Sequence, residues 1–211
     1  MRMDNITKLQ TSYDIGIQKA ARQYAYTKGA TLTAYSAVAV CGLSLAVFLF
    51  KGADAEVLKA SYERLGQYFT KTNMLTGALQ AFVPAFVGAL VCFFAGFSIT
   101  PSIYPHIVLA FQGFFSGGLA CLIYKNGGLL LCISYVFAFL LTCLALALFA
   151  TEAQVFRKSN LEQNRCVKDI LSVRYVLSYI SGFAVPLSLL MASSMLSFVL
   201  PSLIVKYALQ L

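Results

Sequence analysis

The chain has 211 residues, of which 59% are hydrophobic and 11% are charged, and its formal net charge is +8. Because soluble domains carry about 25% charged residues, this composition excludes an ordinary soluble domain and predicts an integral membrane protein. About 20 apolar residues span a bilayer, so we expect an all-α polytopic membrane helix bundle of about five transmembrane helices plus amphipathic interfacial helices, with no room for a separate catalytic domain.

Residues 1–30 form a basic segment ahead of the first apolar run. Apolar residues recur there at spacings typical of an amphipathic helix, from Ile6 to Tyr24. We expect this helix to lie on the cytoplasmic leaflet, held by membrane lipids with anionic head groups; docking of a partner is the alternative. No signal-peptide cleavage site closes the apolar run that follows, so that run is expected to stay in the mature chain.

The first predicted span, residues 31–50, is followed by a polar loop, residues 51–75. Within this loop Leu58, Tyr62, Leu65 and Phe69 fall on one side of a helix and form an apolar stripe. An amphipathic helix with this stripe could rest on the bilayer surface, cap the helix bundle or dock a partner.

From residue 74 to residue 150 the chain contains no Asp or Glu. Two turns divide this stretch: one contains Pro101 and Pro105, and the other is the glycine-rich run from Lys125 to Gly128. The remaining predicted segments are the spans 76–99, 104–124 and 128–150, a basic loop at 151–174, a last span at 175–200 interrupted by Pro186, and a tail at 201–211.

The Lys and Arg residues lie mostly beside the apolar runs, which indicates membrane orientation, so we expect no nucleic acid as a partner. More of them fall on the inner side when the N-terminus is placed in the cytoplasm, as the positive-inside rule requires. Most cysteines lie within apolar runs and no CxxC motif is present, so we expect no disulfide framework, no metal site and no cofactor.

Glycines interrupt the apolar run LAFQGFFSGGLACLIY, residues 109–124. Each costs a helix about 1 kcal/mol relative to alanine, so a compensating interaction is expected. In a bilayer, small residues let helix backbones approach closely, and we predict tight packing of the second, third and fifth predicted spans; a ligand cradle and a hinge are alternatives. The predicted packing residues are Gly113, Gly117, Gly118, Gly77, Ala81, Ala85, Gly88 and Gly96.

Two other classes of function remain open. A small-solute transporter, or the membrane subunit of a transport complex, would need a polar path near the bilayer midplane, for which Gln80, Gln112 and Ser116 are the candidates. An intramembrane enzyme would need His106, the single histidine, together with a carboxylate; since no catalytic motif is present, we expect no catalytic residues.

The layout resembles that of the bacterial stage II sporulation protein M family. The resemblance lies in FAGFSITPSIYPHIVLAFQGFFSGGLACLIYKNGG, residues 94–128, in the Phe156-Arg157 pair, and in MASSMLSFVLPSLI, residues 191–204. It implies a non-enzymatic scaffold in the bacterial plasma membrane that gathers a peptidoglycan amidase and a lytic transglycosylase at the septal or engulfing membrane during endospore formation. Under this resemblance the apolar stripe of loop 51–75 is the candidate docking site, and we expect a homo-oligomer formed through Gly113 and Gly117.

Overall fold

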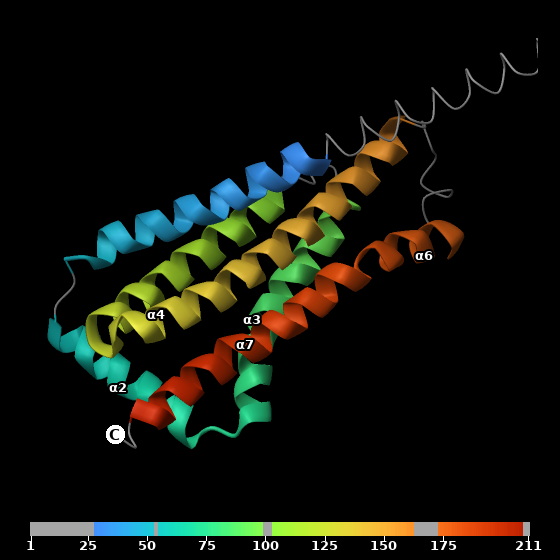
Figure 1. Cartoon of the computed structure of the whole chain (residues 1–211). Helices are drawn as coiled ribbons and strands as arrows, with labels where there is room; N and C mark the ends of the chain where they lie inside the picture. Colours follow the sequence, from blue (N-terminus) through green and yellow to red (C-terminus); the bar gives the residue numbers. More distant parts are fainter. Residues whose placement is uncertain (1–27, 53–54, 99–102, 163–172, 209–211) are drawn as a thin grey trace, which may run out of the picture.

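A computed structural model of the protein describes residues 28–52, 55–98, 103–162 and 173–208 (Figure 1). Five segments are long and apolar enough to cross a membrane: Lys28–Phe50, Met74–Ala95, Ile103–Asn126, Gly128–Arg157 and Ala184–Val205. The predicted all-α polytopic bundle is therefore confirmed. The helices are the first helix, Lys28–Phe50, α2 (Ala55–Lys71), α3 (Met74–Ala95), α4 (Ile103–Glu162), α6 (Val173–Gly182) and α7 (Ala184–Ala208).

Two spans are joined within α4 by a sharp turn at Gly128. This residue has φ 82° and ψ 175°, a conformation that glycine adopts without a steric penalty, so the chain reverses within the glycine-rich run where the sequence predicts a turn. Lys125 Nζ donates hydrogen bonds to the carbonyls of Lys51, at 3.0 Å, and Phe50, at 3.4 Å. A cation thus satisfies the free carbonyls at the end of the first helix, which also suits the helix dipole.

The two ends of the bundle differ (Figure 1). At one end lie α2, the turn at Gly128 and the C-terminal end of α7; we call it the α2 end. At the opposite end lie the start of the first helix, the C-terminal end of α3 and the two ends of α4. An odd number of spans places residue 28 and the end of α7 at opposite ends of the bundle.

The last predicted span, residues 175–200, is not continuous. The helix breaks at Phe183, between α6 and α7, and the apolar span runs from Ala184 to Val205. Pro186 lies in the first turn of α7. Because proline has no N–H to bond the Gly182 carbonyl, it ends one helix and is tolerated at the start of the next.

Small and large apolar side chains together fill the bundle, and many of the side chains exposed on its outer surface are large and apolar. The central helix α4 packs against α3 and α7, and α3 packs against α7. At their contacts Ala89, Cys92 and Ala145 are buried, whereas Phe48, Phe111 and other large side chains are exposed on the surface. This distribution is expected in lipid, where close backbone packing, and not the removal of apolar surface from water, holds helices together.

Candidate functional site

Within α4 we call the span Ile103–Asn126 the first arm and the part from Gly128 onward the second arm. Three glycines bring the first helix and the first arm into backbone contact. A Cβ atom added to Gly113 would overlap the Ala39 carbonyl, and one added to Gly117 would lie 2.6 Å from the Leu43 carbonyl oxygen. Gly42 contributes from the other side, because a Cβ there would overlap the Ala110 carbonyl. The first helix was not among the predicted packing partners of these glycines.

This contact corrects the predicted position of a homo-oligomer interface. The backbone face of Gly113 and Gly117 is covered by the first helix of the same chain, so it cannot also receive a second copy. The formation of a homo-oligomer itself stays a prediction.

The other predicted packing residues meet side chains of neighbouring helices. An added Cβ would lie 3.0 Å from the Phe50 ring at Gly118 and 3.0 Å from Val108 Cγ1 at Gly88, and it would overlap the Phe198 ring at Gly77. Of the two alanines of α3 that were predicted to pack, Ala85 is buried, whereas Ala81 is half-buried and lines a cavity described below.

An aromatic cluster joins α3, α4 and α6 at the end opposite α2. Tyr179 donates a hydrogen bond of 2.6 Å to the Phe93 carbonyl and stacks on Phe156 with ring centroids 4.0 Å apart. Gly96 leaves room for it, since an added Cβ there would overlap the Tyr179 hydroxyl. Tyr179 could not be identified from the sequence, because no periodicity distinguishes it from the other tyrosines.

An ion pair between Lys28 and Glu152 connects the start of the first helix with the second arm of α4. The two side chains are 34% and 19% exposed. Nearby, Tyr35 donates a hydrogen bond of 3.3 Å to Gln154, and its ring lies 4.8 Å from the ring of His106 between centroids. Polar contacts therefore fix the first helix at this end of the bundle.

We expect Glu152→Lys to lower the stability of the folded protein, since it replaces this attraction with a repulsion. The pair is partly exposed, so the expected cost is about 1 kcal/mol. Thermal unfolding of the detergent-solubilised protein measures it. The double variant Lys28→Glu/Glu152→Lys should recover most of the loss; a double variant as unstable as the single one would show that the pair does not interact.

Of the four residues in the apolar stripe of loop 51–75, only Phe69 has a described side chain, and this side chain is buried in the bundle. Phe69 is buried against Phe198, with ring centroids 5.8 Å apart, and Tyr68 donates a hydrogen bond of 3.0 Å to the Gly77 carbonyl. Burial raises the pKa of the Tyr68 phenol, which therefore stays protonated and able to donate. The side chains of the other stripe residues, Leu58, Tyr62 and Leu65, lie outside the described part of the structure.

Phe69 is thus unavailable for docking a partner, and the predicted docking stripe is wrong at this residue. The Phe198 ring that Phe69 contacts lies against Gly77, where an added Cβ would overlap it. Apart from Ala60, the exposed side chains among the described residues of α2 are polar or charged: Glu56, Lys59, Glu63, Arg64, Gln67 and Lys71.

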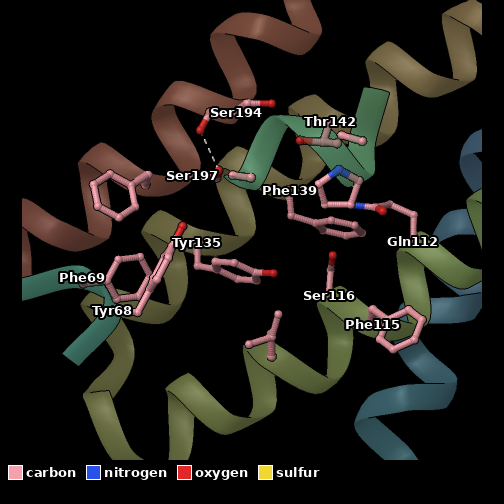
Figure 2. Close-up of a pocket in the computed structure, with 15 residues that line it drawn as sticks. Tyr68, Phe69, Gln112, Phe115, Ser116, Tyr135, Phe139, Thr142, Ser194 and Ser197 are labelled. Atoms are coloured by element: carbon pink, nitrogen blue, oxygen red, sulfur yellow. Dashed lines mark hydrogen bonds between the residues drawn. The ribbon is translucent and has the colours of Figure 1, made fainter. Parts of the chain in front are cut away.

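A cavity of about 320 Å³ lies between α3, both arms of α4, and α7, beside α2. Gln112 and Ser116, both candidates for a polar path, line it (Figure 2). Gln80 does not: α3 buries Ala78, Ala85 and Ala89, which leaves Gln80 exposed on another face. This corrects the predicted path.

Hydroxyl groups from three helical segments also line the cavity. They belong to Ser116, Tyr135, Thr142, Ser194 and Ser197. Ser194 donates to the Leu190 carbonyl and Ser197 to the Ser194 carbonyl, each at 2.8 Å, so their oxygens remain available to accept hydrogen bonds. In Figure 2 the hydroxyls of Tyr135 and Ser116 point into the same space.

Five apolar spans around a shared apolar core define an all-α, multi-pass membrane protein. Comparison with protein-family models, curated proteins and solved structures finds no match to this chain. Within the described residues, no group of three or more His, Cys, Asp or Glu side chains could hold a metal ion. The basic segment 1–27 and residues 163–172 of the basic loop lie outside the described residues.

Proposed function

We propose that the protein is a non-enzymatic scaffold of the bacterial plasma membrane, similar in role to stage II sporulation protein M. In this role it recruits or organises peptidoglycan hydrolases, an amidase and a lytic transglycosylase, at the septal or engulfing membrane during endospore formation. The sequence pattern of residues 94–128 and the layout of five spans support this proposal.

The observation that carries the proposal is the anchoring of α2. Tyr68 and Phe69 attach the C-terminal part of this helix to the bundle through Gly77 and Phe198. The charged side of α2 then faces away from the bundle in a fixed position. With the N-terminus in the cytoplasm, the α2 end lies outside the cell, where peptidoglycan hydrolases act.

Orientation is tested by cysteine labelling in intact cells. In a cysteine-free background, Lys59→Cys on α2 should react with a membrane-impermeant maleimide, and Ser98→Cys at the opposite end should react only after the cells are permeabilised. The reverse pattern would place α2 in the cytoplasm and contradict the proposal.

Partner recruitment is tested by photo-crosslinking in sporulating cells. A photoreactive phenylalanine analogue at Lys59 or Glu63, both exposed, should crosslink an amidase or a lytic transglycosylase. The matched control carries the same analogue at Phe48, which is 77% exposed on the first helix and should contact lipid. Recruitment by α2 would be contradicted if the analogue on α2 gave no crosslink to a hydrolase, or if the analogue at Phe48 gave an equal yield of crosslinks.

A transporter, or the membrane subunit of a transport complex, is the second candidate, and the cavity lined by Gln112 and Ser116 favours it. Since none of the residues that line this cavity is charged, the solute would be uncharged. Proteoliposomes should then take up glycerol faster than empty liposomes, and Ser116→Leu, which fills the cavity, should abolish the difference. Uptake equal to that of empty liposomes would contradict transport of this solute.

A further inference from the structure

The cavity beside Gln112 has the chemistry of a binding site for an uncharged polar group. Its volume of about 320 Å³ is at the lower end of the range of about 300–1,000 Å³ found for small-molecule pockets. Its lining combines aromatic rings with hydroxyl groups and one amide, and no residue that lines it is charged. Such a site accepts a neutral group with hydrogen-bonding atoms and an apolar body.

Gln112 is a polar side chain on the wall of this cavity. It lies in the apolar span Ile103–Asn126, and Figure 2 shows its side chain directed toward the other residues of the cavity. Within the described residues no protein hydrogen bond to its amide is found. Because a polar group in an apolar medium is costly without a partner, a bound molecule that accepts from and donates to this amide would stabilise it.

The hydroxyl groups opposite Gln112 complement such a ligand. Ser194 and Ser197 direct their hydrogens to backbone carbonyls, so each presents an oxygen that accepts a hydrogen bond. Thr142 is similar, because its Oγ1 lies 3.1 Å from the Ala138 carbonyl oxygen and 3.0 Å from Ser193 Oγ. The amide of Gln112 can donate to an ester carbonyl, while these oxygens can accept from a hydroxyl group.

The surroundings indicate entry from the bilayer and not from water. On the side of α2, Tyr68, Phe69 and Phe198 pack together with ring centroids 5.4 to 5.8 Å apart and form an aromatic wall of the cavity. On another side the lining residue Phe115 is 63% exposed on the apolar span Ile103–Asn126, and in a bilayer an exposed side chain on such a span faces the acyl chains. A molecule dissolved in the bilayer can therefore reach the cavity past Phe115.

From these observations we propose that the cavity binds the head of an uncharged glycerolipid of the diacylglycerol class, with its acyl chains leaving past Phe115 into the bilayer. The volume fits a glycerol head with its ester groups and excludes a complete lipid. This proposal is independent of the scaffold and uses the same cavity as the transport candidate, but its test measures binding and not flux.

The test uses a diacylglycerol that carries a diazirine, incorporated into liposomes with the purified full-length protein. Irradiation should label peptides that contain residues 112–119 and 135–142. Gln112→Leu should reduce this labelling about fivefold, as expected for the loss of one buried hydrogen bond. Ser116→Leu, which fills the cavity, should reduce it further.

Gln80→Leu is the matched control, because it makes the same change on an exposed face of α3 outside the cavity, and it should leave the labelling unchanged. The thermal unfolding temperature of each variant verifies that it is folded. Equal labelling of wild type and Gln112→Leu, both folded, would overturn the proposal. Equal labelling by a diazirine phosphatidylcholine would also overturn it, and loss of labelling in excess glycerol would assign the site to a water-soluble polyol instead.

Discussion

Gly113→Leu is expected to prevent the first helix from packing on α4 and to leave little folded protein. Overpacking costs about 1–3 kcal/mol where side chains can move aside. At Gly113 the obstacle is the Ala39 carbonyl, part of a helix backbone, so the expected loss is at least about 3 kcal/mol. The measurement is the fraction of detergent-solubilised protein that stays folded and monodisperse on heating.

Two controls belong to this prediction. Gly117→Leu, beside the Leu43 carbonyl, should have a similar effect. Gly29→Leu should have almost none, because among the described residues no atom of another segment lies within 4 Å of an added Cβ there. A stable Gly113→Leu monomer that has lost only its ability to oligomerise would contradict the contact within the chain. It would instead place a second copy of the protein on these glycines.

Phe198→Ala is expected to release α2 from the bundle. The Phe198 ring is 2% exposed and contacts the rings of Tyr68 and Phe69, and its loss leaves a void against both. A buried Phe→Ala change costs about 3–5 kcal/mol. Although α3 also loses the contact at Gly77, the loss should fall mainly on α2, because α3 and α7 also pack against each other and against α4. Hydrogen exchange of the α2 backbone amides should become much faster, while exchange in α3 and α7 changes little.

The control for this prediction is Phe48→Ala, because Phe48 is 77% exposed on the first helix. It makes the same chemical change without removing a contact to α2, and exchange in α2 should stay as in the wild type. If Phe198→Ala also left exchange in α2 unchanged, the ring contacts would not be what attaches α2, and the carrying observation for the scaffold would be lost.

The five spans could be predicted because each is a long apolar run bounded by charge, proline or glycine. The turn at Gly128 was predictable for the same reason, since a glycine-rich run with one lysine interrupts an otherwise apolar stretch of the sequence. The break at Phe183 was harder to place, because Pro186 indicates that a helix is interrupted but not on which side of the proline the chain bends. Helix existence follows from local composition, whereas helix ends depend on a few backbone hydrogen bonds.

The partners of the small residues could not be predicted, because periodicity defines the face of a helix but not what lies against it. Gly113 and Gly117 were identified, yet Gly42 on the first helix, which faces their surface, was missed. The spacing of Ala39, Gly42 and Ala46, three buried small residues on one face, was the available signal. Similarly, Gln80 and Gln112 each lie in an apolar run of the sequence, and only the packing of α3 shows that Gln80 faces away from the cavity that Gln112 lines.

The contact between the first helix and α4 also affects how the protein is made. The surface of the first helix around Gly42 meets residues 110–117, and the carbonyls at the end of this helix accept hydrogen bonds from Lys125. When only the first two spans have been inserted, the segment that packs against the first helix has therefore not yet been synthesised. During synthesis the first span stays in the bilayer, or beside an insertion chaperone, without this packing partner until the third span emerges. Nascent chains truncated before residue 126 should therefore be degraded faster than longer ones.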